Sequence, residues 1–293
     1  MISDLIKLLR LRQWTKNFFI FIPLFFSGQL LNIYLLLNNL IAFVSFCFIA
    51  SSIYCLNDII DINADRKHPI KKNRPIASNK ISIRQGYAIM IICLLVGILF
   101  PIIIINENHI KVLSVFSIYI LLNIAYCLYL KKIALIDVMI VSLGFVFRIL
   151  VGGYSANIQL SNWLIIMTFL LALFLALAKR RDDVIIFEKT NVTLRKNIDK
   201  YNVSFLNQAI TIVATIIVVS YIMYTISEKV MHRFNSEYLY VTSIFVLLGI
   251  LRYMQLTIVE ELSGSPTEIL FKDRIIQSSI LGWVLLYSYI IYF

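Results

Sequence analysis

Residues 40–66 read LIAFVSFCFIASSIYCLNDIIDINADR, an apolar run that ends directly in a row of acidic side chains. The run is part of an apolar block over 36–57, and about 20 apolar residues are enough for one helix to cross a bilayer. A helix that is apolar on every face is either a core helix of a large protein or a membrane span. This stretch therefore predicts a membrane helix that carries acidic groups to one surface of the membrane.

The rest of the sequence has the same apolar character. Hydrophobic residues make up 60% of the 293 residues and charged residues 15%, against averages of about 45–50% and about 25% in soluble proteins. We expect an all-α integral membrane protein, with one polytopic domain over 1–293 and a kink at Pro23 in its first span. Nine spans are predicted, over 15–33, 36–57, 86–105, 112–130, 134–152, 162–178, 205–226, 238–255 and 275–292.

The cysteines give no sign of a disulfide framework or a metal site. All four lie inside apolar blocks, at spacings that match neither pattern. We therefore expect buried free thiols. The four residues are Cys47, Cys55, Cys93 and Cys127.

The positive charge is distributed by membrane side. The net charge is +11, and 23 of the 27 Lys and Arg residues fall in alternate segments between the predicted spans. Positive residues accumulate on the cytoplasmic side of membrane proteins. We therefore expect a bacterial-type cytoplasmic (inner) membrane protein, with the N-terminus and the loops over 58–86 and 179–204 in the cytoplasm. Cations spread over alternate loops do not form one nucleic-acid-binding face, so nucleic acid is not an expected partner.

The acidic row that ends the second predicted span has the spacing of one helix face. Asn57 and Asp61 are four residues apart, as are Asp61 and Asp65, while Asp58 lies three residues before Asp61. Carboxylates stacked in this way repel one another unless a cation lies between them. Hard oxygen ligands with positions left for water and phosphate oxygens are typical of Mg²⁺, so we expect these four residues to hold that ion. A solvated acidic helix end is the alternative.

A strongly basic loop follows the acidic row. Five cations lie within the next nine residues, a density suited to a polyphosphate held by Mg²⁺. His68 is either a general base or a hydrogen-bonding residue at a turn. Ser82 and Gln85 have the spacing of a capping box at the start of the third span. The five cations are Arg66, Lys67, Lys71, Lys72 and Arg74.

A second charged segment, Lys179-Arg180-Arg181-Asp182-Asp183, follows the sixth predicted span. Lys179 and Asp183 are four apart and share a helix face. The predicted loop over 179–204 is long for a connection, which suggests a lid or a substrate-shaping loop. We expect the loops over 58–86 and 179–204 to form the site together.

Three further residues are candidates for substrate binding. Tyr126 and Lys131 lie at the end of the fourth span, on the side of the acidic row. Arg148 lies inside the fifth span, where an arginine is costly unless it faces a polar cavity or finds an internal partner. Both alternatives remain open for Arg148.

The acidic row, Asn57-Asp58-x-x-Asp61-x-x-x-Asp65, resembles the first aspartate-rich motif of the UbiA prenyltransferase superfamily. Its flanks are similar to the branch that contains decaprenyl-phosphate phosphoribosyltransferase. Two departures are present: the second acidic motif is less regular, and Asn79 stands where the branch has glycine, a position that asparagine tolerates because it adopts left-handed conformations readily. The flanks are Arg12-Gln13-Trp14-x-Lys16-Asn17, the stretch over 68–78, Lys179-Arg180-Arg181, and Ser265-Pro266-Thr267 with Asp273-Arg274.

This resemblance implies a nine-helix bundle with a cytoplasm-facing cavity that is open to lipid. The implied reaction is the Mg²⁺-dependent transfer of 5-phosphoribose from phosphoribosyl diphosphate to a polyprenyl phosphate. It implies that Asp58, Asp61 and Asp65 act in catalysis as metal ligands together with Asn57. The implied phosphate contacts are Lys16, Lys71, Arg74, Lys179 and Arg180.

Two other functions are weighed against this one. A prenyltransferase on the same scaffold would use an isoprenyl diphosphate donor and an aromatic or polar acceptor. The excess of Lys and Arg beside the acidic row favours the donor that carries an additional 5-phosphate. A transporter would place its charges near the membrane midplane, whereas these charges gather at one membrane face.

Overall fold

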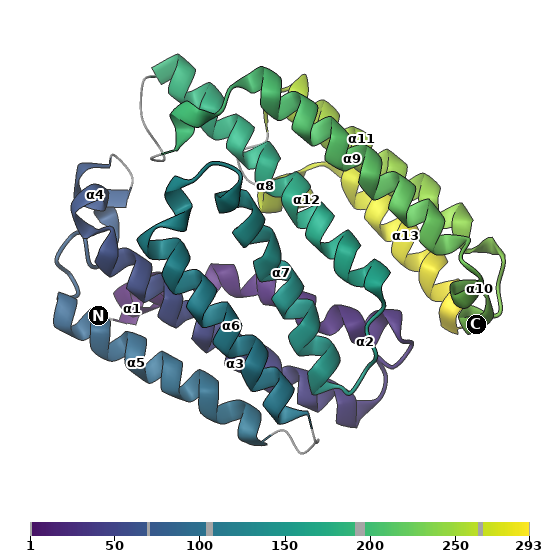
Figure 1. The fold of residues 1–293 in the computed structure, drawn as a ribbon, viewed down its shortest axis with the longest axis horizontal. Coiled ribbons are helices and arrows are strands. Elements are labelled where there is room, and N and C mark those ends of the chain that lie inside the picture. The colour runs from purple at the N-terminus through teal and green to yellow at the C-terminus, as the bar shows by residue number, and fades with distance from the viewer. Residues whose placement is uncertain (1, 69–70, 104–107, 191–196, 263–265, 293) are drawn as a thin grey trace. The chain divides into compact units, whose positions relative to one another are not determined.

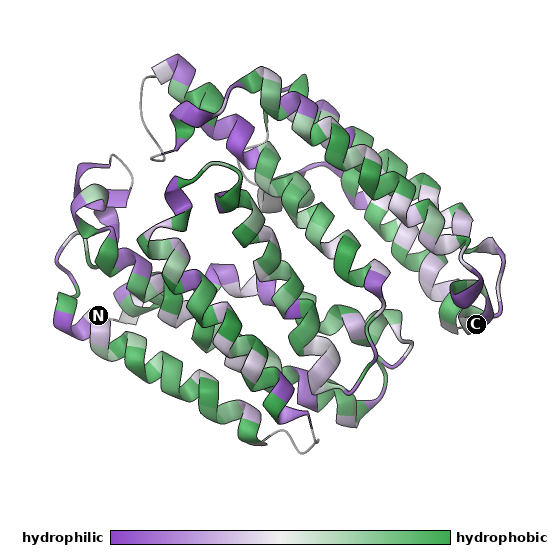
Figure 2. Ribbon diagram, viewed as in Figure 1, coloured by the Kyte–Doolittle hydropathy of each residue, from purple (hydrophilic) through white to green (hydrophobic). Residues whose placement is uncertain are grey.

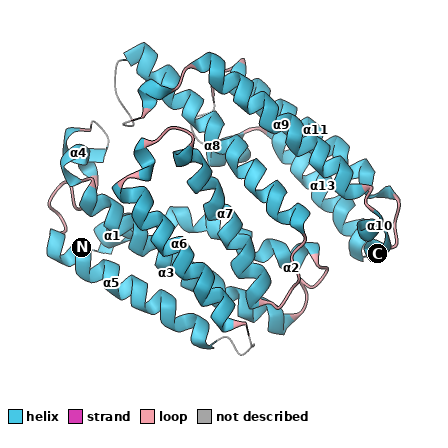
Figure 3. Cartoon of the chain, in the orientation of Figure 1, coloured by secondary structure: helices cyan, strands magenta, loops and turns pink. Residues whose placement is uncertain are grey.

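The computed structural model describes residues 2–68, 71–103, 108–190, 197–262 and 266–292 (Figure 1). Within these ranges the chain consists of helices and their connections, with no β-strand (Figure 3). The predicted all-α fold is therefore confirmed. The chain divides into two compact units, Met1–Leu160 and Ser161–Phe293.

The helices follow one another with short connections. The first unit contains α1 (Ile2–Leu9), η1 (Leu11–Phe21, a 3₁₀ helix), α2 (Ile22–Phe26), α3 (Ile33–Ile60), α4 (Ile62–Lys67), η2 (Lys71–Asn73), α5 (Ile83–Leu99), η3 (Phe100–Ile103), α6 (His109–Leu128), η4 (Leu130–Lys132) and α7 (Ile136–Ser155). The second contains α8 (Asn162–Thr190), η5 (Ile198–Lys200), α9 (Val203–Thr225), α10 (Glu228–Phe234), η6 (Tyr238–Thr242), α11 (Ser243–Ile258), α12 (Pro266–Lys272) and α13 (Arg274–Tyr292).

Eight helical segments in the described residues are long and apolar enough to cross a membrane. They correspond to the second to ninth predicted spans, and Figure 2 shows α5 as hydrophobic along nearly its whole length. The segment predicted as the first span, 15–33, forms no single long helix but divides between η1 and α2. Pro23 lies at the start of α2, and proline has no N–H to continue a helix from the preceding turn. A membrane crossing by residues 15–33, and with it the total of nine crossings, stays a prediction.

Two of the spans are longer than the sequence predicts. α3 continues to Ile60 and α8 continues to Thr190, so charged residues that fall within the predicted loops over 58–86 and 179–204 lie on helices, as their spacings of three and four residues indicated. With 28 and 29 residues, these helices are about 42–44 Å long at about 1.5 Å per residue, against about 30 Å for the hydrocarbon core. Each helix is therefore longer than the hydrocarbon core is thick, and its backbone hydrogen bonds continue through the charged turns at its end.

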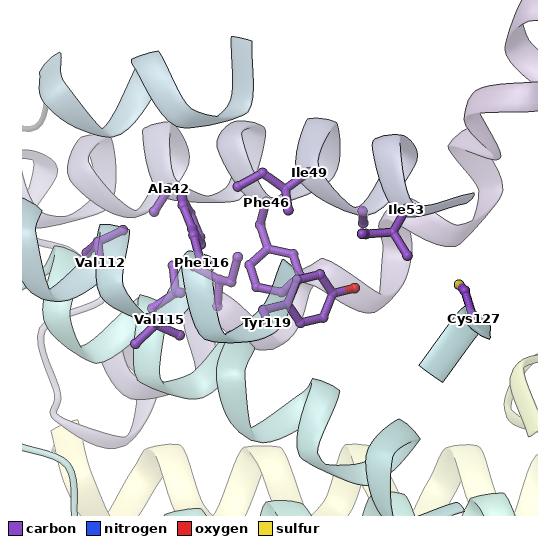
Figure 4. Close-up of a cluster of buried hydrophobic side chains, with 12 residues drawn as sticks. Ala42, Phe46, Ile49, Ile53, Val112, Val115, Phe116, Tyr119 and Cys127 are labelled. Atoms are coloured by element: carbon purple, nitrogen blue, oxygen red, sulfur yellow. The ribbon is translucent and has the colours of Figure 1, made fainter. Parts of the chain in front are cut away.

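α3 is the central helix of the first unit, packed against α5, α6, α7 and η1. Its buried face contributes to a cluster that includes Phe46, Phe116 and Tyr119 (Figure 4). The Phe46 ring lies 5.7 Å from the Phe116 ring and 4.7 Å from the Tyr119 ring, between ring centroids. Such aromatic contacts add to the burial of apolar area and fix the rotation of α3 about its own axis.

Close backbone contact joins α7 to η1. A Cβ atom on Gly152 would lie 2.0 Å from the carbonyl oxygen of Ile20. The same carbonyl accepts a hydrogen bond from Asn39 Nδ2 at 3.0 Å, so Ile20 is fixed from α3 as well. Gly152 is therefore required for the docking of the N-terminal segment.

In the second unit, α8 packs against α9, and α11 packs against α9 and α13. Arg181 on α8 donates to Asn207 Oδ1 at 2.6 Å and to the Thr257 carbonyl at 2.7 Å. Arg252 on α11 forms an ion pair with Asp273, at 2.7 Å, just before α13 begins. These contacts set the register of the four long helices at the ends that carry the charged turns.

Several local predictions are confirmed. Ser82 and Gln85 form a capping box at the start of α5, with each side chain bonded to the backbone N–H of the other. Asn79 adopts a left-handed conformation with φ 59°, as expected of asparagine in place of glycine. All four cysteines are buried and free.

The contact between α7 and η1 yields a prediction for stability. We expect Gly152→Ala to destabilise the purified protein by about 1–3 kcal/mol or more, because the added methyl group meets backbone that cannot rotate away. The melting temperature in detergent measures the effect.

Gly249→Ala is the matched control on α11. The nearest atom to a Cβ there, Ser279 Cβ, is 3.8 Å away, an ordinary contact distance. The control variant should be as stable as the parent or slightly more so, because alanine favours helix. Equal melting temperatures for the two variants would contradict the assigned role of Gly152.

Candidate active site

Two residues of the acidic row, Asn57 and Asp61, bind a lysine. Asn57 lies in the last turn of α3, and Asp61 is the residue at which α3 ends and α4 begins. Lys131 Nζ, from η4, donates to Asn57 Oδ1 at 3.3 Å and to the two Asp61 oxygens at 2.8 and 2.7 Å. Three oxygen atoms therefore converge on one positive charge, so Lys131 lies beside the acidic row, and its predicted contact with substrate stays a prediction.

The other two residues of the acidic row, Asp58 and Asp65, bind arginines. Arg74 Nη1 lies 3.0 Å from Asp58 Oδ1 and 2.7 Å from Asp65 Oδ2, so it bridges the two carboxylates. Arg10 Nη2 donates to the same Asp58 oxygen. Asp58 is 2% exposed, and a carboxylate at this depth requires cationic partners.

Arg10 is the site residue that sequence reasoning missed, since its charge was counted only toward membrane orientation. It reaches the acidic row because the N-terminal segment is tied to α3. Trp14 Nε1 donates to Ser51 Oγ at 3.1 Å, and Ser51 in turn donates to the Leu9 carbonyl at 2.9 Å. No spacing rule could have found Arg10, because its partner is 48 residues away.

Hydrogen bonds hold the described part of the loop between α4 and α5. Arg66 donates to the Ala77 carbonyl at 3.2 Å and to Asn79 Oδ1 at 2.7 Å, which closes the loop beside Arg74. His68 Nδ1 accepts the backbone N–H of Lys71 at 3.3 Å. Partial burial and the Lys71 charge lower the pKa of His68. His68 thus makes the hydrogen bond of the turn-bonding alternative, and a role as general base stays a prediction.

The four predicted metal ligands form two pairs. No three carboxylate, histidine or cysteine side chains in the described part of the chain are grouped as a metal site. The oxygens of Asn57 and Asp61 nevertheless surround one cationic nitrogen, and amide and carboxylate oxygens are the donors that Mg²⁺ prefers. These two residues fit a magnesium ion, whereas Asp58 and Asp65 are occupied by guanidinium groups.

Arg148 is buried in the first unit with internal partners. Its Nε donates to Asn17 Oδ1 at 2.8 Å and its Nη1 to the Gly144 carbonyl at 2.6 Å. The Phe46 ring centroid is 4.7 Å from the guanidinium carbon. Its described partners include no carboxylate. This geometry matches the internal-partner alternative, and a contact with substrate stays a prediction.

The charged turn of α8 divides between two roles. Arg180 Nη1 forms an ion pair with Asp183 Oδ2 at 3.0 Å, three residues along the helix. Arg181 bonds to α9 and α11, and these contacts are structural. Lys179 is exposed on the same helix. The assignment of Lys179, Arg180 and Asp183 to substrate binding stays a prediction.

The remaining predicted residues lie in the first unit. Lys16 is exposed on η1. Lys71 is the first residue of η2, which ends directly before Arg74. Tyr126, near the end of α6, packs against the cluster around Phe46. Their contacts with substrate also stay predictions.

These features define a multi-pass helical membrane protein with a compact group of carboxylates and cations at the ends of its helices. The model of the UbiA prenyltransferase family matches residues 18–265. The chain belongs to the UbiA prenyltransferase family. The resemblance drawn from the aspartate-rich motif is therefore confirmed.

Curated relatives match nearly the whole chain. The decaprenyl-phosphate phosphoribosyltransferase of Mycolicibacterium smegmatis is 34% identical over 305 residues, covering 100% of this chain and 94% of the relative. The enzyme of the same name from Corynebacterium glutamicum is 32% identical over 286 residues, covering 96% and 85%.

Solved structures support the same fold. A UbiA homolog from Archaeoglobus fulgidus, bound to GPP and Mg²⁺, superposes with a TM-score of 0.70 at 16% identity, covering 97% of this chain and 98% of that one. A digeranylgeranylglyceryl phosphate synthase superposes with a TM-score of 0.67 at 19% identity, covering 97% of each chain. At these identities the likeness shows the fold alone.

The buried guanidinium of Arg148 yields a second prediction. Asn17→Asp would place a carboxylate at 2.8 Å from Arg148 Nε, and the variant should be at least as stable as the parent because a buried charge gains a counter-ion. Asn17→Leu removes the acceptor and should cost about 1–3 kcal/mol. Thermal unfolding of the two variants in one detergent makes the comparison. An aspartate variant less stable than the leucine variant would contradict this account.

Proposed function

We propose that this protein transfers 5-phosphoribose from phosphoribosyl diphosphate to a polyprenyl phosphate, with Mg²⁺, and releases diphosphate. The proposal is supported mainly by one observation: the side-chain oxygens of Asn57 and Asp61 bind a cationic nitrogen, and arginines that could bind phosphate lie beside them. Two relatives that match almost the whole chain carry the name of this activity, which supports the choice of donor and acceptor.

In this proposal Asn57 and Asp61 hold the magnesium ion. Bound Mg²⁺ supplies positive charge that stabilises the diphosphate as it leaves the anomeric carbon. Lys131 Nζ occupies these oxygens in the structure, so in this proposal it gives way to the ion and provides a further positive charge beside the leaving group. Lys71 and Arg74, on the neighbouring loop, would neutralise phosphate oxygens of the substrates that lie away from the ion.

The acceptor requires little activation. A phosphate oxygen of the lipid is anionic at pH 7, so no strong base is needed to remove a proton from it. In this proposal His68, whose Nδ1 accepts the Lys71 N–H, is not required as a base. Displacement at the anomeric carbon by the lipid phosphate, on the side opposite to the diphosphate, would invert the configuration there.

The position in the membrane follows from the charge distribution. We place the N-terminus and the acidic row in the cytoplasm of a bacterial-type cell, because the Lys and Arg residues concentrate in the segments on that side. A cytoplasmic site has direct access to a soluble sugar diphosphate. The lipid acceptor would reach it from within the membrane.

The main test compares donors on one purified protein. Labelled phosphoribosyl diphosphate with a polyprenyl phosphate should give a labelled lipid in the presence of Mg²⁺, and a chelator should abolish the product until Mg²⁺ is restored. An isoprenyl diphosphate with an aromatic acceptor is the competing pair. Product from that pair alone would replace the proposal with an ordinary prenyl transfer.

A substitution at Asp61 tests the metal assignment. Asp61→Asn keeps the shape of the side chain but removes its charge, and we expect transfer at saturating Mg²⁺ to fall at least about 100-fold. Glu237→Gln removes an exposed carboxylate before η6 and should leave the rate unchanged. Transfer within a few-fold of the parent in Asp61→Asn would remove Asp61 from the metal site.

A further inference from the structure

Two guanidinium groups meet on one buried carboxylate oxygen. Arg10 and Arg74 both donate to Asp58 Oδ1, although they come from the N-terminal segment and from the loop after α4. Two like charges side by side repel each other, and one carboxylate oxygen does not offset both. Asp65 supplies a second carboxylate, but only to Arg74. The arrangement holds two arginines close together at the same place.

The backbone at Arg10 is bent to reach this position. Arg10 adopts a left-handed conformation with φ 53° between α1 and η1, which is uncommon for a residue other than glycine. Its guanidinium lies over the Tyr54 ring, 4.8 Å from the centroid, so one face is covered and the plane is fixed. A strained residue whose side chain is held this firmly is a candidate for a functional role.

Both arginines retain hydrogen-bond donors for a ligand. A guanidinium has five N–H groups, and in the described contacts Arg10 uses its Nη2 and Arg74 its Nη1. Each side chain is 25% exposed, in contrast to Asp58 beneath them at 2%. The carboxylate orients the pair from the buried side, and the unused donors remain for the accessible side.

The surrounding charge favours an anion. Taken together, the acidic row, the basic loop that follows it and the two partners Arg10 and Lys131 contain three carboxylates and seven cations, an excess of four positive charges. The carboxylates are Asp58, Asp61 and Asp65, and the cations are Arg10, Arg66, Lys67, Lys71, Lys72, Arg74 and Lys131.

We propose that Arg10 and Arg74, aligned by Asp58, form a binding site for a phosphate monoester that is separate from the cation site at Asn57 and Asp61. Planar guanidinium groups bind phosphate oxygens in pairs, whereas a lysine offers a single point charge. The ligand's identity rests on the proposed function, in which two such groups occur, the 5-phosphate of the donor and the phosphate of the lipid. Asp58 is then a positioning residue.

Ligand binding to the full-length protein in detergent tests this site. Arg10→Lys keeps a positive charge for Asp58, and Arg74→Lys is a second variant in case the first is poorly folded. The probes are ribose 5-phosphate, a short-chain prenyl phosphate, and diphosphate with Mg²⁺. Arg84→Gln is the control, because it removes an exposed cation from the first turn of α5, at the end of the same predicted cytoplasmic segment.

We expect each lysine variant to bind one of the two monoesters at least about ten-fold more weakly, with diphosphate affinity changed less than about two-fold. Loss of ribose 5-phosphate assigns the site to the donor, and loss of prenyl phosphate assigns it to the acceptor. Monoester affinities equal to those of the control, or an equal loss for all three probes, would overturn the proposal.

These measurements do not depend on turnover. If the parent protein does not transfer phosphoribose but the lysine variants bind the monoester more weakly than the parent does, the proposed function is refuted and the arginine site is supported. Intact transfer with unchanged monoester binding in the lysine variants would refute the arginine site alone.

Discussion

Asp58 joins three parts of the first unit at the point where α3 leaves the apolar core. Its carboxylate accepts bonds from Arg10 before η1 and from Arg74 in the loop after α4, and Asp65 on α4 shares the second arginine. A buried carboxylate without these partners would be strongly unfavourable. The N-terminal segment and the basic loop are therefore held against the end of α3, and the neighbouring Asn57 and Asp61 remain available to Lys131.

The local features of this arrangement could be predicted from the sequence. Long apolar runs predicted eight spans that the structure contains, because burial in lipid leaves a strong and continuous signal. The capping box at Ser82 and the left-handed Asn79 depend only on neighbouring residues, and both could be predicted. Lys131 could be assigned to the same membrane side as the acidic row because successive spans alternate in direction, and it contacts Asp61 in the structure.

Other features depended on contacts that no local pattern records. The pairing of Arg10 with Asp58 joins residues 48 apart, and the split of the acidic row into two pairs follows from which cation reaches which carboxylate. Helix ends were the second source of error. Charged residues suggested that α8 stops before Lys179, yet helical hydrogen bonding persists in water as well as in lipid, so the helix continues to Thr190.

The continuity of α3 has a consequence for how this chain can vary. From Phe46 in the aromatic cluster to Asn57 the backbone is one uninterrupted helix, in which each residue adds about 1.5 Å of rise and about 100° of rotation. Exchanging one apolar side chain for another leaves that angle intact. Gaining or losing a single residue there would turn the oxygen ligands a quarter-circle or more away from Lys131, so this stretch tolerates changes in composition far better than changes in length.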